Sequence, residues 1–112
     1  MPPWFVPALA CLPLLACVPP MPDPAELFLD RIEAGILLPP GARPFSAYSR
    51  SYFKIQDGAK VMGVYSTLSP PGRRWVPANP GPFVMDGGCA IITVIIDVRT
   101  ERIEHAECNG VG

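Results

Sequence analysis

The chain has 112 residues, with nine Lys and Arg residues against ten Asp and Glu residues, and its formal net charge is −1. This near balance excludes the dense basic surface that nucleic-acid binding requires, so we expect no nucleic-acid partner. The length fits one small domain, in which a covalent cross-link would add noticeably to a modest hydrophobic core.

No charged side chain precedes Asp23. A transmembrane helix would need roughly 20 apolar residues with an unbroken ladder of backbone hydrogen bonds. Prolines at positions 3, 7, 13, 19 and 20 interrupt such a ladder, and they interrupt a buried core helix for the same reason. A signal peptide tolerates these breaks because it is removed, so the sequence predicts an export signal.

Residues 14–17 read Leu-Leu-Ala-Cys, an apolar run that ends in a small residue and a cysteine. This junction resembles the lipobox of bacterial lipoproteins, and the resemblance covers only the first 17 residues. It implies cleavage after residue 16, attachment of a diacylglycerol to the Cys17 thiol and acylation of the new amine. Several acyl chains anchor a protein firmly. The alternatives are lipidation at Cys11 after a shorter apolar stretch, a plain secretory signal, and an untargeted apolar N-terminus.

Residues 17–22 then predict a short Pro-rich tether, which favours an extended polyproline conformation, and residues 23–112 predict the folded domain. Asp23 is a good helix cap, Pro24 suits the first helical position and Glu26 completes a capping box. The helix has an apolar stripe and stops before the prolines at positions 39 and 40. The stripe consists of Phe28, Leu29, Ile32 and Ile36.

Two stretches predict β-hairpins. In the first, residues 48–55 alternate in polarity, Asp57 and Gly58 supply the turn, and residues 61–65 return. Gly63 inside the returning arm indicates a bulge or a close approach of backbone. In the second, the apolar run at residues 90–96 predicts a central strand, residues 97–101 a turn, and residues 102–108 the returning arm.

The register of the second hairpin stays open. A two-residue loop at positions 98 and 99 places Cys89 directly across from Cys108, whereas a longer loop offsets them diagonally. Either arrangement allows a disulfide after some adjustment of the strands. Export would leave these two cysteines as a pair in an oxidising compartment. Their bridge would stabilise the domain by about 3 kcal/mol.

Other uses of the cysteines are disfavoured by their spacing. A redox catalyst usually carries Cys-x-x-Cys, and a zinc site needs ligand pairs that a chain with one histidine does not offer. We therefore predict no metal and no cofactor. That histidine, His105, lies between Glu104 and Glu107. It could serve a hydrolase as a general base, but no nucleophile motif accompanies it, and a surface strand position explains it better.

Residues 67–88 predict a long irregular connection, and connections of this length often either bind a partner or are simply mobile. Arg73, Arg74 and Trp75 within it combine two cations with an indole, a set that suits an anionic or sugar-bearing partner. The competing interpretation is a solvated loop with Trp75 packed on the sheet.

Together these features predict an α+β domain in which one N-terminal helix packs on a mostly antiparallel sheet of about four strands, arranged as two hairpins. They are similar to the small lipoproteins of Gram-negative envelopes. That resemblance implies a periplasm-facing, lipid-anchored protein, with the outer membrane as its expected membrane. We expect a non-enzymatic scaffold or binding module for an envelope protein or glycan. The alternative is an inhibitor that inserts residues 69–82 into a wall-degrading enzyme.

Overall fold

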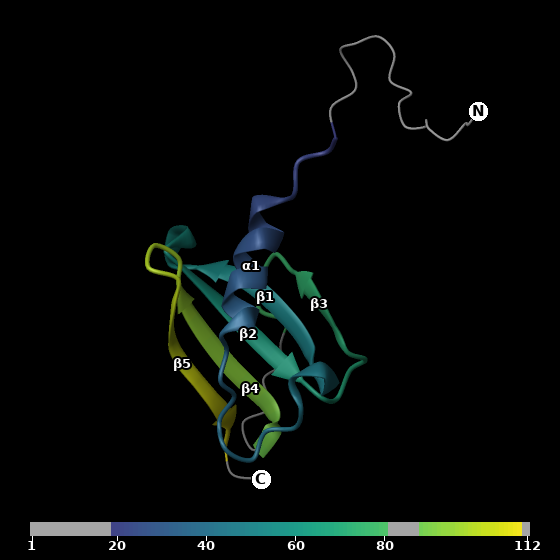
Figure 1. Ribbon diagram of the computed structural model, residues 1–112. Coiled ribbons are helices and arrows are strands. Elements are labelled where there is room, and N and C mark those ends of the chain that lie inside the picture. Colours follow the sequence, from purple (N-terminus) through teal and green to yellow (C-terminus); the bar gives the residue numbers. More distant parts are fainter. Residues whose placement is uncertain (1–18, 81–87, 111–112) are drawn as a thin grey trace, which may run out of the picture. The chain divides into compact units, whose positions relative to one another are not determined.

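The computed structural model describes residues 19–80 and 88–110. It contains a helix, α1 (Pro24–Ala34), and a five-stranded mixed sheet, so the expected α+β class is confirmed (Figure 1). The strands are β1 (Ser49–Ile55), β2 (Lys60–Ser66), β3 (Gly72–Trp75), β4 (Gly88–Asp97) and β5 (Arg102–Asn109). Their order in the sheet is β3-β1-β2-β4-β5. Contacts divide the chain into Met1–Asp30 and Arg31–Gly112, and the second unit holds the whole sheet.

The helix begins at the predicted cap. Asp23 accepts a hydrogen bond at Oδ1 from the backbone N–H of Ala25, at 2.9 Å. This bond satisfies one of the amides that a helix N-terminus leaves without an intrahelical partner. The helix ends at Ala34, and the next residue, Gly35, donates its N–H to the carbonyl of Ile32. The predicted stripe divides into two buried and two half-buried side chains: Leu29 and Ile32, then Phe28 and Ile36.

The antiparallel pairing predicted between residues 48–55 and 61–65 is confirmed. β1 and β2 pair without a register shift from Ser49 opposite Ser66 to Ile55 opposite Lys60. Gly63 marks a close approach and not a bulge, because its pairings with β1 and β4 are both regular. A Cβ at this position would lie 2.9 Å from the ring of Tyr52, so only glycine leaves room for that ring.

The prediction of an irregular connection over residues 67–88 is wrong in its first half, because β3 lies there. β3 runs parallel to β1, with Ser49 opposite Gly72 and Tyr52 opposite Trp75. The sheet therefore has a fifth strand, and that strand is parallel. Its sequence, Gly-Arg-Arg-Trp, contains no β-branched residue, and Trp75 is its only residue of a type enriched in strands, so its side chains give a weak strand signal. Pairing with the backbone of β1 specifies it instead.

The second antiparallel pair forms around a longer loop than two residues. Asp97 pairs with Arg102, which leaves residues 98–101 as the loop. Register shifts further along the strands then compensate for this length, and Gly88 pairs with Asn109. Cys108 pairs with Ile92, and the irregularity between Gly88 and Ile92 brings Cys89 close to Cys108. Their Cα atoms are 4.5 Å apart, and the two form the predicted disulfide.

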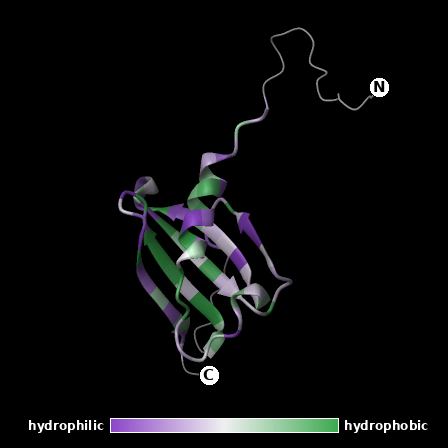
Figure 2. Ribbon diagram, viewed as in Figure 1, coloured by the Kyte–Doolittle hydropathy of each residue, from purple (hydrophilic) through white to green (hydrophobic). Residues whose placement is uncertain are grey.

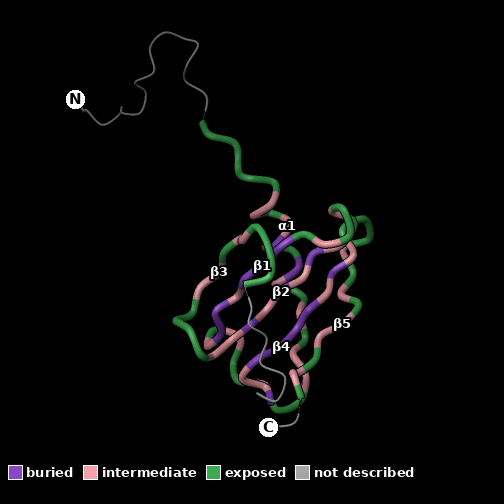
Figure 3. Tube along the Cα trace, turned by 180° about the vertical axis from the view of Figure 1, so that it is seen from behind, coloured by how far each residue is buried: buried purple, intermediate pink, exposed green. Residues whose placement is uncertain are grey.

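The core lies at the middle of the sheet. Hydrophobic residues concentrate on β2 and β4, and hydrophilic residues concentrate on β3 and along β5 (Figure 2). Buried backbone likewise follows β1, β2 and β4, whereas the two edge strands are half-buried or exposed (Figure 3). The shortness of β3 and the charged residues of β5 make both edges poor templates for unwanted strand pairing. The largest fully buried side chains are Tyr48, Tyr52, Tyr65, Leu29, Ile92, Ile96, Val61 and Val94.

Candidate functional site

The three residues that the sequence singles out for partner binding lie on the edge strand β3. Neighbouring side chains of a strand point to opposite faces of the sheet. Arg73 stands beside Arg50 on β1, and Arg74 stands beside Ser51. Arg73 and Trp75 therefore share one face, and Arg74 lies on the other, so the three side chains do not form a single patch.

Arg73 belongs to a largely buried ionic cluster around Glu33, in the last turn of α1. The Glu33 carboxylate accepts hydrogen bonds from Arg50 Nε at 2.9 Å and from Arg73 Nη1 at 3.1 Å. The Tyr52 hydroxyl donates to the same carboxylate at 2.6 Å. The side chains of Glu33, Arg50 and Arg73 are only 11%, 14% and 18% exposed. The cluster fixes the last turn of α1 to β1 and β3, which is a structural task.

The Tyr52 hydroxyl also lies 2.5 Å from the hydroxyl of Tyr65. Because Tyr52 donates its hydrogen to Glu33, Tyr65 donates to Tyr52. Burial raises the pKa of Tyr52 far above its ordinary value, and the neighbouring Tyr65 and Glu33 raise it further. Burial likewise raises the pKa of Tyr65, to about 12. Both phenols therefore stay protonated near neutral pH.

These phenols make the fold sensitive to alkali. A tyrosine whose pKa in the folded state exceeds 10.0, its ordinary value, stabilises the fold below that pH and loses this contribution as the pH rises. We expect the domain to unfold above about pH 10, with the ionisation of Tyr52 and Tyr65 accompanying unfolding. Tyrosinate absorbance and circular dichroism, followed together during a titration, check this. Complete ionisation while the circular dichroism stays native would contradict it.

Arg74 has a different environment from its neighbour. Arg74 is exposed. Its Nη1 atom donates hydrogen bonds to Ser49 Oγ at 2.6 Å and to Ser51 Oγ at 3.4 Å. Both serines are nearly inaccessible, at 4% and 9% exposure. No carboxylate among the described residues forms an ion pair with Arg74. The structure thus holds this guanidinium in place without neutralising it.

Trp75 packs against the sheet. Its ring centroid lies 6.0 Å from that of Tyr52 at a tilt of 50°, and the residue is half-buried. Its indole N–H is buried and finds no acceptor within residues 19–80 and 88–110. This position matches the interpretation in which Trp75 covers the sheet.

His105 lies on β5 with its side chain 37% exposed, and its Nε2 atom is 3.8 Å from Glu107 Oε1. In the described part of the chain, no hydroxyl or thiol forms a hydrogen bond with it. His105 thus lies at the accessible strand position that the sequence predicts for it.

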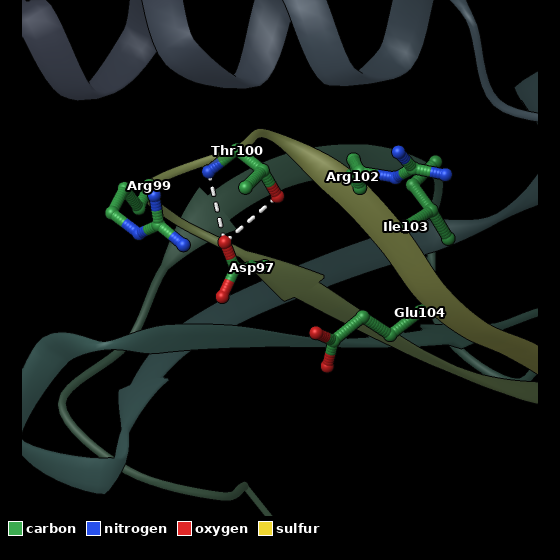
Figure 4. Close-up of a pocket in the computed structure, with 6 residues that line it drawn as sticks. All are labelled: Asp97, Arg99, Thr100, Arg102, Ile103 and Glu104. Atoms are coloured by element: carbon green, nitrogen blue, oxygen red, sulfur yellow. Dashed lines mark hydrogen bonds between the residues drawn. The ribbon is translucent and has the colours of Figure 1, made fainter.

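A shallow hollow lies at the turn between β4 and β5, lined by Asp97, Arg99, Thr100, Arg102, Ile103 and Glu104 (Figure 4). Asp97 accepts hydrogen bonds from the backbone N–H and the hydroxyl of Thr100, both at 2.8 Å. These bonds hold the pKa of the Asp97 carboxyl below its ordinary value, and Lys60 adds to the effect. Lys60 also binds Glu104. Asp97 thus closes the turn between β4 and β5, and Glu104 pairs with Lys60 on β2.

Two further observations limit the kinds of site. No helix in the described residues is long and apolar enough to cross a membrane. Within the same residues, no three acidic, histidine or cysteine side chains gather in a way that could hold a metal ion. Cys17 and Cys11 lie outside the described residues. No family model matches the sequence, and neither a curated protein nor a solved structure matches the chain.

The sequence interpretation missed Glu33 and the two serines beneath Arg74. Glu33 follows Leu29 by four residues, so it lies on the buried side of the helix. A carboxylate on that side is a usable signal for a buried ion pair. Ser49 and Ser51 gave no such signal. Arg74 reaches them only because β3 pairs with β1, and the sequence did not predict that pairing.

Proposed function

We propose that the chain is a lipid-anchored protein of the bacterial cell envelope, attached through Cys17 and facing the periplasm. The observation that carries this proposal is the disulfide between Cys89 and Cys108. These are the two cysteines that remain after residues 1–16 are removed and Cys17 is acylated. A structural disulfide persists in an oxidising compartment and rarely in the cytosol. The helix cap at Asp23, directly after the Pro-rich segment, supports a tether that ends there.

The domain acts, in this proposal, as a non-enzymatic binding module for another envelope component, a protein or a glycan. The edge strand β3 offers the surface, because Arg74 presents an exposed cation there. The alternative, an inhibitor that inserts residues 69–82 into a wall-degrading enzyme, needs a protruding loop. Residues 72–75 are instead paired with β1, and Arg73 is held by Glu33. These contacts favour a binding face over an inserted loop.

Intact mass spectrometry of the membrane-associated protein tests the anchor and the disulfide together. We expect a mass equal to residues 17–112 plus the acyl chains and less the two hydrogens lost on forming the bridge. Reduction should restore those hydrogens without releasing the lipid, because thioether and amide bonds resist mild reductants.

A Cys17→Ala variant provides the control for the lipid site, and Cys11→Ala is its matched partner. We expect only Cys17→Ala to abolish acylation and release the protein from membranes. An unmodified mass that begins at Met1 would refute the proposed export. Acylation lost with Cys11→Ala alone would move the anchor to that residue.

A further inference from the structure

We infer that Arg74 is the partner-binding arginine of β3 and that it binds a carboxylate group on an acidic peptide segment of the partner. This inference rests on the proposed binding function and names the chemistry of its ligand. It also separates Arg74 from Arg73, which the sequence presents as an equivalent neighbour.

The first step is the difference in charge balance between the two arginines. Arg73 is 18% exposed and forms an ion pair with Glu33 at 3.1 Å. A partner could reach it only by displacing that carboxylate. Arg74 lies on the opposite face, is exposed, and meets only hydroxyl groups among the described residues. A partner can therefore bind the positive charge of Arg74 without breaking an ion pair among the described residues.

The second step is the arrangement of hydrogen-bond donors around Arg74. A guanidinium carries five N–H donors, and the two serines engage only those on Nη1. Ser49 and Ser51 are themselves only 4% and 9% exposed, so they position the guanidinium and do not contact a partner. The remaining N–H groups of Arg74 find no anion among the described residues. They suit an anionic oxygen, since charge-assisted bonds are shorter and stronger than neutral ones.

The third step is the choice between a carboxylate and a phosphate. One guanidinium neutralises one carboxylate, and its planar fork matches the two carboxylate oxygens. A phosphate near neutral pH carries up to two negative charges, and the chain as a whole has a net charge of −1. The site thus offers a single cation on a weakly acidic protein. That charge complementarity favours a carboxylate.

The two nearest serines give the site its rigidity. An exposed arginine normally loses considerable side-chain entropy when it binds. Here the two hydroxyls already hold Nη1 against β1, so part of that loss occurs on folding and not on binding. This preorganisation distinguishes Arg74 from exposed cations such as Arg102.

The test uses NMR of the lipidated protein in detergent micelles with ¹⁵N-labelled arginine. The probe is a blocked hexaglutamate peptide, with hexaglutamine as the uncharged control. We expect hexaglutamate to shift the Nε–Hε signal of Arg74 saturably and to leave that of Arg73 in place. Arg74→Gln should weaken binding roughly tenfold or more, and Ser49→Ala with Ser51→Ala roughly fivefold. Arg74→Lys keeps the charge but lacks the planar fork of the guanidinium, so its affinity for hexaglutamate should lie between those of the wild type and Arg74→Gln.

Arg102→Gln is the matched control, because it removes one exposed charge at the other edge of the sheet. Equal weakening by Arg102→Gln and Arg74→Gln would mean unspecific charge attraction and would overturn the inference. A larger Arg74 shift with inorganic phosphate than with hexaglutamate would overturn the carboxylate assignment. If Arg74→Gln fails to fold, the inference is still tested by the hexaglutamate-induced shift of the Arg74 Nε–Hε signal in the wild-type protein and by the binding of the two serine variants. A correctly lipidated mass with no Arg74 shift would refute this inference and leave the anchoring intact.

Discussion

Replacing Glu33 by glutamine is expected to lower the free energy of unfolding by about 3 kcal/mol. The carboxylate neutralises Arg50 and Arg73 and accepts the Tyr52 hydroxyl, in a setting where each charged side chain is less than a fifth exposed. Glutamine keeps the volume, but it removes the negative charge and exchanges one acceptor oxygen for an amide donor. The guanidiniums would then keep their charge in a poorly hydrated place without a counter-ion.

The matched control is Glu104→Gln. Glu104 binds Lys60, but its side chain is 42% exposed, so solvent screens the pair. An exposed pair of this kind contributes about 0–1 kcal/mol. Urea unfolding of both variants, monitored by circular dichroism, measures the difference. Equal losses for the two variants would contradict the structural role of the Glu33 cluster.

A double-mutant cycle separates the ion pair from packing. Arg50→Met removes one charged partner, and it retains much of the aliphatic packing over Phe45, whose ring lies 4.5 Å from the guanidinium. Combining it with Glu33→Gln should cost less than the sum of the two single changes, because each single change leaves an unpaired group behind. The coupling energy in this cycle is expected to be on the order of 1 kcal/mol or more.

The sequence predicted those parts of the fold that local signals specify. The capped helix, the first antiparallel pair and the disulfide each depend on residues close in the chain or on a strong apolar run. Gly63 illustrates a signal that was recognised but had two possible meanings. The regular pairing of Gly63 with both neighbouring strands excludes the bulge, and the Tyr52 ring over its backbone explains the close approach.

The parts that were not predicted depend on pairing between distant segments. β3 is four residues long and has only one side chain of a strand-favouring type, Trp75, so its existence depends on pairing with the free edge of β1. The same pairing decides that Arg73 meets Glu33 and Arg74 meets Ser49. The sequence therefore drew attention to both arginines, but it could not show that they face different environments.

Replacing both Cys89 and Cys108 by serine is expected to lower the free energy of unfolding by about 3 kcal/mol. The two cysteines are 19 positions apart in the sequence, and closing a loop of that size reduces the entropy of the unfolded chain. Cys17 is unchanged in this variant, so the proposed anchor is unaffected and the comparison concerns the domain alone. Urea unfolding of the variant, beside that of the reduced and the oxidised wild-type protein, measures the effect.

The loss should spread to the loop that precedes β1. The Tyr48 hydroxyl donates to the carbonyl of Cys89 at 2.7 Å and accepts from the backbone N–H of Arg43 at 3.0 Å. Gly41 lies so close that a Cβ there would be 3.2 Å from the Cys89 sulfur. Since the disulfide fixes Cys89, its removal should loosen this loop and accelerate hydrogen exchange at the Arg43 amide.

Tyr48→Phe is the matched variant for this second effect, because it removes the bridging hydroxyl and keeps the disulfide. It should accelerate exchange at the Arg43 amide, with a loss of stability of about 1–3 kcal/mol for the unsatisfied buried groups. Unchanged Arg43 exchange in the serine variant would show that the loop is held independently of the disulfide. A serine variant as stable as the wild type would mean that native packing alone holds β4 and β5 together, in which case the cysteines would no longer support an exported location.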